Sequence, residues 1–260
     1  MHFNHILPND KFIDAVIHNS AALVRAAERG LDAAVPSCPG WTVRDVVNHM
    51  GMLQRQKAFV VGEDRTDNEF VLDPPGDDLL GWFREGTELL VKVLKSTSPE
   101  AKRWSWFPSG QTAGFWCRRI SQETLIHRVD VELAHNAVTT VDEDMATDGV
   151  DEALVVFLMR KPSWVTITPS DSFIRLKTPQ RSWLLQEADM SGKTRSGPEL
   201  SGPAIVLQDS DHGSPVACEI SGAASALDLW LWGRGDLSNL VVTGDASHAD
   251  RLRAAAAASM

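Results

Sequence analysis

The stretch from Trp116 to Ala134, WCRRISQETLIHRVDVELA, constrains this chain more than any other. As an α-helix, in which each residue advances by about 100°, it places Glu123 and His127 in the middle of a face that is otherwise apolar. Such a face normally packs into a core. An unpaired polar group there costs roughly 2–7 kcal/mol, and a charge costs more. The apolar members of the face are Trp116, Ile120, Val131 and Ala134.

A bound divalent metal is the compensation that suits this pair of side chains best. Glu123 and His127 are one helical turn apart, so their polar ends can converge on one point. A hydrogen bond between the two residues, or partial exposure to solvent, would also satisfy both groups. Because Glu-x-x-x-His occurs on helices by chance, the helix alone does not decide between these explanations.

The composition indicates a globular protein and limits its partners. The 260 residues suffice for one large domain or two ordinary ones. The net charge of −10 argues against a nucleic acid or an anionic membrane as partner. The three cysteines are far apart and form no CxxC pair, which disfavours a disulfide framework or a thiolate zinc site. They are Cys38, Cys117 and Cys218.

No targeting or membrane-spanning pattern is found in the sequence. The opening segment MHFNHILPND lacks a basic stretch followed by an apolar run, as a signal peptide would have. No segment approaches the ~18 consecutive apolar residues that a membrane span needs. We therefore expect a soluble, cytoplasmic protein.

The first part of the chain is predicted to be helical. Thr42, followed by Asp45, indicates a capping box at the start of the second helix, directly after the turn VPSCPGW at 35–41. The segment 96–110, with two prolines and two tryptophans, is expected to be a long connection that is either a functional loop or a packed lid. The predicted helices span 9–29, 43–60, 77–95 and 116–134, with a fifth at 149–160 capped by Asp148.

The pattern changes after Pro162, where short β-rich runs alternate with turn residues. We therefore expect an α+β protein of two domains: a four-helix bundle at 1–161 and a small α+β domain at 162–260. A flexible connection is expected at 191–203, and Ser221 is expected to cap an amphipathic helix. The predicted strands span 173–178, 182–187, 204–208, 216–220 and 240–243, and an alanine-rich helix ends the chain.

Three segments together resemble the mycothiol-dependent maleylpyruvate isomerase family. They are VPSCPGWTVRDVVNHMG at 35–51, QETLIHRVDVELA at 122–134 and LDLWLWGRGD at 227–236. The first is the most specific and the last the least. The resemblance implies a DinB-like metal-binding helical bundle, followed by a domain related to sterol-carrier folds.

The family's metal ligands match His49, Glu123 and His127, so the resemblance supplies a third ligand. Two histidines and one carboxylate leave coordination positions open, as in catalytic rather than structural zinc sites. The same donor set suits several divalent metals. Zinc is the ion that we expect here.

The resemblance also singles out residues near the expected site. Asp130, one turn beyond His127, either orients the imidazole of that ligand or pairs with an arginine on the surface. Arg234 matches an active-site arginine of the family, and its guanidinium could hold a substrate carboxylate. Cys38 is a possible nucleophile, but its position between two prolines favours a structural role.

The implied function is the activation of a small thiol, mycothiol, by a divalent metal for attack on a small electrophile. The thiolate either adds to a cis double bond, so that rotation and elimination give the trans isomer, or it is transferred to the electrophile. A non-catalytic metal- or ligand-binding module and a metal-dependent hydrolase are the alternatives. The sequence leaves open the electrophile and whether the protein is a monomer or a homodimer.

Overall fold

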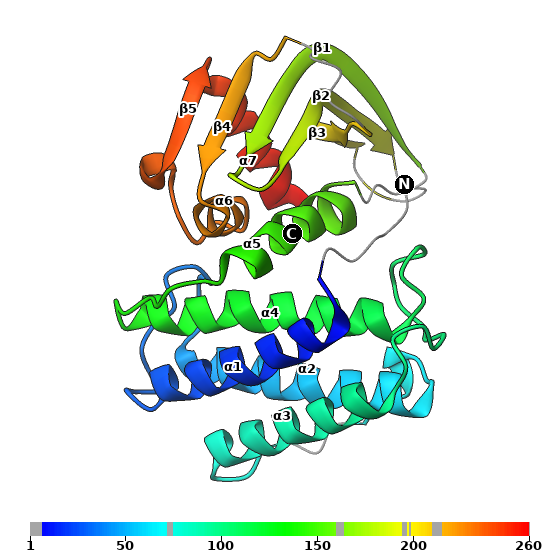
Figure 1. Cartoon of the computed structure of the whole chain (residues 1–260), viewed down its shortest axis with the longest axis vertical. Coiled ribbons are helices and arrows are strands. Elements are labelled where there is room, and N and C mark those ends of the chain that lie inside the picture. The colour runs from blue at the N-terminus through cyan, green and yellow to red at the C-terminus, as the bar shows by residue number, and fades with distance from the viewer. Residues whose placement is uncertain are drawn as a thin grey trace. The chain divides into compact units, whose positions relative to one another are not determined.

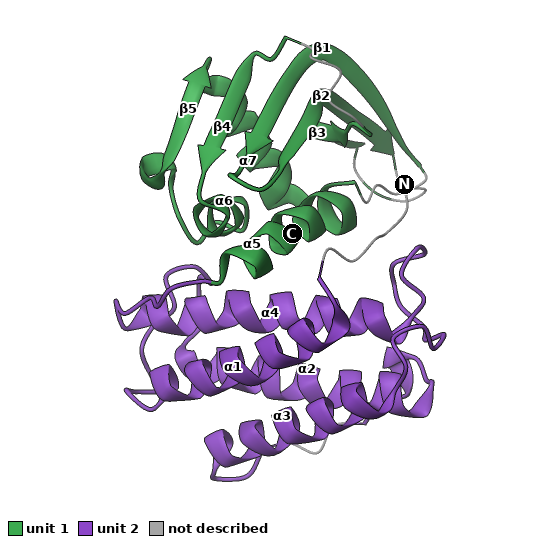
Figure 2. Cartoon of the chain, in the orientation of Figure 1, with its two compact units in different colours: residues 1, 142–260 green, residues 2–141 purple. Residues whose placement is uncertain are grey.

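The computed structural model describes residues 7–71, 75–159, 164–193, 197, 199–209 and 215–259. The chain forms two compact units, one of residues 2–141 and one of residues 142–260 with residue 1 (Figure 2). The first unit contains α1 (Asn9–Ala27), α2 (Val43–Glu63), η1 (Asp67–Glu69), α3 (Leu79–Ser96) and α4 (Ala113–Ala134).

The first unit is a four-helix bundle in which α1 packs along α4 and α2 packs along α3 (Figure 1). Its core is formed by apolar side chains that recur at helical spacing, as the sequence predicts. Asp45 accepts hydrogen bonds of 2.7 Å from both the backbone N–H and the hydroxyl of Thr42, so the predicted capping box begins α2. The core includes Leu23, Val46, Val47, Met50, Phe83 and Val131.

The second unit is a five-stranded sheet with helices. It contains α5 (Glu143–Glu152), η2 (Ala153–Leu158), α6 (Ala224–Leu231), η3 (Leu237–Asn239) and α7 (Ser247–Ser259). The strands are β1 (Val165–Lys177), β2 (Ser182–Lys193), β3 (Glu199–Leu207), β4 (Cys218–Gly222) and β5 (Leu240–Gly244), in the order β3-β2-β1-β4-β5. All pairs are antiparallel except β1 with β4. The expected α+β fold is thus confirmed.

The fifth helix begins earlier than the sequence predicts. Asp142 is its N-cap and accepts a 2.9 Å hydrogen bond from the N–H of Met145, whereas Asp148, the predicted cap, is buried within the helix. The helix continues into one π-helical segment, η2, which ends at Leu158. The expected stop at Pro162 lies outside the described residues.

The division between the units also differs from the expected domain boundary after residue 161. Helix α5, which was expected to belong to the bundle, packs against α6 in the second unit. Glu143 at the start of α5 accepts a 2.7 Å hydrogen bond from the N–H of Ala224. This carboxylate therefore caps α6, whose N-cap position is Ala223 and not the predicted Ser221.

The sheet is larger than the sequence predicts. Strands β1 and β2 pair beyond the expected runs, from Val165 opposite Gly192 to Pro169 opposite Ala188. The predicted flexible connection at 191–203 is therefore wrong for the residues that belong to β2 and β3. The end of β2 is polar and glycine-containing at Ser191–Lys193, which hides it, whereas Val165, Thr166, Ile167 and Thr168 alternate apolar and polar residues and could have been assigned to a strand.

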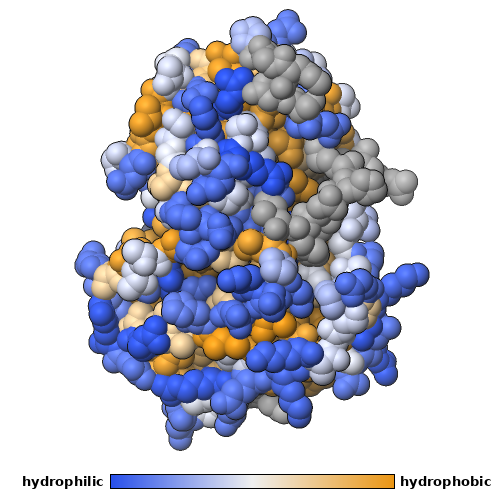
Figure 3. Space-filling view, in the orientation of Figure 1, coloured by the Kyte–Doolittle hydropathy of each residue, from blue (hydrophilic) through white to orange (hydrophobic). Residues whose placement is uncertain are grey.

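The visible face of the bundle is largely polar (Figure 3). Hydrophilic side chains cover most of the bundle's visible face, and apolar side chains show only in a band between them (Figure 3). In the described part of the chain, no helix combines the length and apolar character needed to cross a membrane.

Candidate metal centre

The loop before α2 prepares the position of His49. In this loop the Val35 N–H donates a 2.9 Å hydrogen bond to the Trp41 carbonyl, and the Trp41 N–H donates a 3.0 Å hydrogen bond to the Cys38 carbonyl. Gly40 has a φ of 85°, a conformation that glycine adopts without strain. The Trp41 ring is stacked on His127, with centroids 6.4 Å apart, and lies 5.3 Å from the ring of His49.

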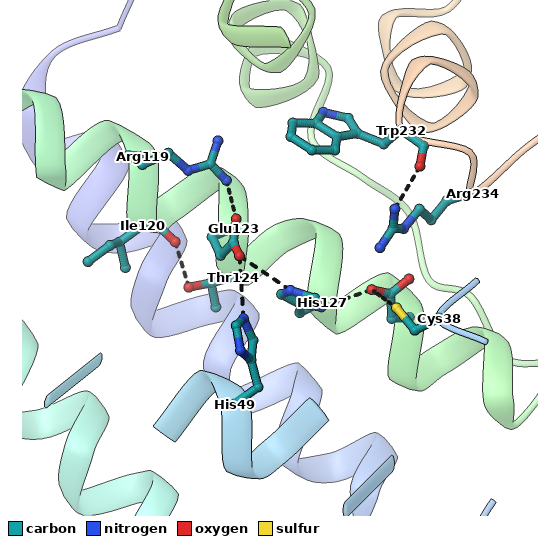
Figure 4. A network of polar contacts seen from close by, with 10 residues as sticks. Cys38, His49, Arg119, Ile120, Glu123, Thr124, His127, Trp232 and Arg234 are labelled. Atoms are coloured by element: carbon teal, nitrogen blue, oxygen red, sulfur yellow. Dashed lines mark hydrogen bonds and ion pairs between the residues drawn. The ribbon is translucent and has the colours of Figure 1, made fainter. Parts of the chain in front are cut away.

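Helices α2 and α4 bring the three predicted ligands together. The Oε1 atom of Glu123 lies 3.6 Å from Nε2 of His49 and 3.4 Å from Nε2 of His127 (Figure 4). One ligand atom from each residue lies within 4.8 Å of the other two. The predicted convergence is therefore present: two imidazole nitrogens and one carboxylate oxygen face a common point.

The site is less buried than the sequence argument assumed. The exposed fractions of the side chains are 28% for His49, 25% for Glu123 and 11% for His127. Nearly all other residues of α4 are buried, polar ones included. Glu123 and His127 thus mark the place where this helix opens to solvent, which leaves room for a ligand to approach.

The charge of Glu123 is stabilised by the Arg119 guanidinium and by hydrogen bonds with the two histidines. Burial acts to raise the pKa of its carboxyl group, but the Arg119 guanidinium and both histidines outweigh this and hold the pKa well below its usual range. Arg119, one turn earlier on α4, donates a short hydrogen bond to Oε2. Oε1, the other oxygen, is the atom that faces the histidines. The carboxylate is therefore oriented as well as ionised.

His127 is held through its second ring nitrogen. Nδ1 lies 2.9 Å from Oδ2 of Asp130, whose side chain is fully buried. Burial acts to lower the pKa of His127, but the Asp130 and Glu123 carboxylates raise it to about 9. A ligating histidine commonly donates its other N–H to a carboxylate, which directs the free nitrogen to the metal. Asp130 has this geometry.

Asp130 also accepts hydrogen bonds from two residues of the loop before α2. The Ser37 hydroxyl donates to Oδ1 at 2.5 Å, and the Cys38 Sγ lies 3.4 Å from Oδ2. Cys38, His127 and Asp130 form a second group with ligand atoms within 4.8 Å. Because Oδ2 of Asp130 already contacts both other members, this group is an internal hydrogen-bonded cluster, and the first group is the better metal site.

The donor set fits a divalent metal. It combines two imidazole nitrogen donors with one ionised oxygen donor, which is the ligand chemistry of catalytic zinc sites once a bound ion has displaced the Nε2 proton of His127. Glu123 supplies the negative charge, and the partial exposure of all three ligands leaves space for further ligands. His49, Glu123 and His127 are therefore the residues that could hold the ion.

Sequence reasoning missed Ser37 and Arg119 at the site, and also Lys57 further along α2, where the Glu123 charge acts to raise the pKa of its ammonium group. Arg119 could have been found, since it precedes Glu123 by four residues on the same helix. Lys57 lies two turns beyond His49 on α2, is buried, and pairs with Asp67 at 2.7 Å. Its ammonium lies 4.3 Å from the centre of the Trp116 ring, and burial lowers its pKa.

The connection before α4 is packed by its own hydrogen bonds. The indole of Trp116 donates a 2.6 Å hydrogen bond to the carbonyl of Trp104. Gln111 donates to the backbone of Ser105 and Phe107 at 2.8 Å. Of the two roles considered for 96–110, the structure supports a packed segment.

Arg234 belongs to the second unit, just after α6. Its side chain donates a 2.7 Å hydrogen bond to the carbonyl of Trp232 (Figure 4). A second guanidinium is close by: a Cβ added at Gly233 would overlap the Nη2 of Arg253, and burial and the charge of Arg234 lower the pKa of Arg253. Among the described residues, no carboxylate pairs with Arg253. The two guanidiniums lie close enough for their charges to repel.

Models of two protein domains match this sequence, and both belong to one family. The model "Mycothiol maleylpyruvate isomerase N-terminal domain" matches residues 13–132, and the model of the C-terminal domain of the same family matches residues 144–251. The chain belongs to this family. The two matched ranges lie within the two structural units.

Two solved structures of the mycothiol maleylpyruvate isomerase family share the fold. They are the crystal structure of the mycothiol-dependent maleylpyruvate isomerase, with a TM-score of 0.58, and that of a histidine-to-alanine mutant, with a TM-score of 0.57. Each is 15% identical to this chain, and the match covers 94% of this chain and 95% of the other. A comparison with curated protein sequences finds no match.

Proposed function

We propose that this protein is a metal-dependent enzyme that uses mycothiol to act on a small electrophile, and that its reaction is a cis–trans isomerisation of the maleylpyruvate type. The observation that carries the proposal is the convergence of His49, Glu123 and His127 on one partly exposed point. Membership of the family supplies the thiol and the reaction class.

A divalent metal at this point would supply Lewis acidity that lowers the pKa of a bound thiol. The protein's own part is to hold and orient. Asp130 lies 2.9 Å from Nδ1 of His127 and would hold a proton on this nitrogen, so that Nε2 is the nitrogen that gives up its proton to a metal. Arg119 holds one oxygen of Glu123 and leaves the other free for the site.

The chemistry balances without an oxidant or reductant. The deprotonated thiol forms a C–S bond to one carbon of the cis double bond, and the electron pair moves to the conjugated carbonyl oxygen. Rotation about the resulting single bond follows. The C–S bond then breaks, the trans double bond forms, and the thiolate is released unchanged. The same site would serve an S-transferase if the electrophile kept the sulfur.

Arg234 is our candidate for binding a carboxylate of the electrophile. Its guanidinium can bind a carboxylate through two parallel hydrogen bonds. The neighbouring Arg253 guanidinium strengthens the local positive potential. Replacement of Arg234 by Lys keeps the charge but removes the planar fork, so we expect KM for an anionic electrophile to rise by about tenfold. The test is steady-state kinetics at fixed mycothiol.

The first experiment is to measure metal content and isomerase activity of the same preparations. We expect about one divalent ion per chain in the wild type, and mycothiol-dependent isomerisation of maleylpyruvate. Glu123→Gln and His49→Ala are expected to lose both, with unchanged far-UV circular dichroism. Product analysis with other electrophiles separates isomerisation from S-transfer.

A matched control is available on the same helical bundle. Glu63→Gln changes an exposed residue of α2 that does not belong to the site, and this variant should retain metal and activity. A wild-type protein that remains metal-free when given zinc would overturn the metal-dependent mechanism. Stoichiometric metal without thiol-dependent turnover would instead favour a binding module.

A further inference from the structure

A second, basic cavity lies in the bundle between α1, α4 and residues 137–140. Its volume is about 380 Å³, within the range of small-molecule sites. Three arginines line it: Arg25 from the last turn of α1, Arg29 from the turn that follows this helix, and Arg128 from α4. His18 is a further cavity residue, and Glu132 is the only carboxylate among its described lining residues.

Arg128 is buried in the wall of this cavity with part of its hydrogen-bonding capacity unused. Its side chain is 3% exposed, and its Nε has no hydrogen-bond partner. The terminal nitrogens make only long hydrogen bonds of 3.3–3.4 Å to the carbonyls of Thr139 and Thr140. The donors of a buried guanidinium are normally satisfied. This guanidinium can therefore donate further hydrogen bonds to an anion bound in the cavity.

Glu132 forms an ion pair with Arg128, but one carboxylate leaves a cluster of three arginines with an excess of positive charge. Both its oxygens accept hydrogen bonds from Thr139, at 3.0 Å from the backbone N–H and at 2.7 Å from the hydroxyl. The nearest oxygen is 3.6 Å from Nε of Arg128, which is too long for a hydrogen bond. Through these two hydrogen bonds the Glu132 carboxylate holds Thr139, in the segment after α4, at the wall of the cavity.

Arg25 and Arg29 have no acidic partner among the described residues. They are four residues apart in the chain, at the end of α1 and just after it, so that two like charges lie on one side of the cavity. Arg25 lies in the last turn of α1, where the helix dipole favours a cation. That explains one arginine but not the gathering of three around a hollow in a protein with a net charge of −10.

We propose that this cavity is a binding site for a small anionic molecule bearing a carboxylate or phosphate group. Guanidinium forks recognise both groups through paired hydrogen bonds. The site is separate from the metal centre: Arg128 follows His127 on α4, but it faces α1, whereas His127 faces His49 on α2. The proposal does not depend on the proposed isomerase function.

The test is thermal unfolding with sodium phosphate and with sodium succinate, each against sodium chloride at equal ionic strength. We expect a saturable rise in Tm with at least one of the two anions. In Arg25→Gln/Arg29→Gln the apparent affinity should fall by about tenfold or more, because two charged donors are lost. These residues are exposed, so the variant should fold. The preferred anion identifies the group that the site takes.

Two controls make the outcome decisive. Arg44→Gln removes an exposed arginine of α2 that pairs with Asp32, and its response to the anions should equal that of the wild type. Glu123→Ala removes the metal ligand, and the rise should persist in it. No rise with either anion would overturn the proposal. The proposal would also be overturned if Tm rose equally in the double arginine variant, or if the rise in Tm were lost only in Glu123→Ala.

Discussion

Asp130 is the residue on which the orientation of the site depends most. It is fully buried and contacts His127, Ser37 and Cys38. Replacing it with Asn would put an amide NH2 group, which only donates, in the place of one of the two carboxylate oxygens that accept hydrogen bonds. The Nδ1 proton of His127 would then lose its preferred acceptor. We expect Asp130→Asn to weaken metal binding by about 10–100-fold, the usual effect of losing such a partner. Competition with a chelator measures it.

The matched control is Asp32→Asn, which changes an exposed aspartate that pairs with Arg44. It should bind metal like the wild type. Since Asp130 also ties the loop before α2 to α4, far-UV circular dichroism must show that the variant is folded. A folded Asp130→Asn protein with unchanged metal affinity would show that Asp130 serves only to anchor the loop.

The sequence predicted the ligand residues of the site better than their surroundings. Glu123 and His127 follow from helical spacing, whereas His49 came only from the resemblance, because nothing local distinguishes it from a packed histidine. The exposure of Glu123 could not be predicted. Helix α4 is buried on almost all sides, so its amphipathic pattern does not say which face is open. Ser37 gave no signal, since its contact is with a residue far along the chain.

At the scale of elements, Gly51 permits the close packing of α2 on α3. A Cβ at this position would overlap the six-membered ring of Trp82. Alanine favours a helix by about 1 kcal/mol over glycine, but the clash with a large, rigid ring costs more. We expect Gly51→Ala to lower the free energy of unfolding by about 1–3 kcal/mol. Urea unfolding followed by circular dichroism measures it.

Gly62 on the same helix is the matched control for Gly51. There, an added Cβ would make ordinary contacts of 3.5–3.6 Å with Val93. Gly62→Ala should therefore keep the gain in helix propensity and stabilise the protein by up to about 1 kcal/mol. If both variants were stabilised, Trp82 would have to move away at little cost, and the packing argument would fail.

Helices were predictable from this sequence and strand lengths were not, for a physical reason. A helix is specified by local periodicity and caps, as at Thr42 and Asp45, although an earlier acidic cap, Asp142, was overlooked. The length of β1 and β2 depends on pairing between residues far apart, such as Val165 with Gly192. The cap of α6 likewise comes from Glu143, a distant residue that no local pattern reveals.

At the scale of the whole molecule, all three proposed metal ligands belong to one of the two compact units, residues 2–141. A ligand stabilises only the structure that binds it, by about 2.7 kcal/mol at a concentration of 100 times Kd. Removal of the metal should therefore loosen the bundle and leave the sheet unaffected. We expect chelation to speed hydrogen exchange in peptides of α2 and α4, but not in those of β1, β2 and β4. Glu123→Gln should exchange at the faster rate with or without zinc. Equal acceleration in both units would show that they unfold together, and no change in α2 and α4 would mean that the three side chains bind no metal.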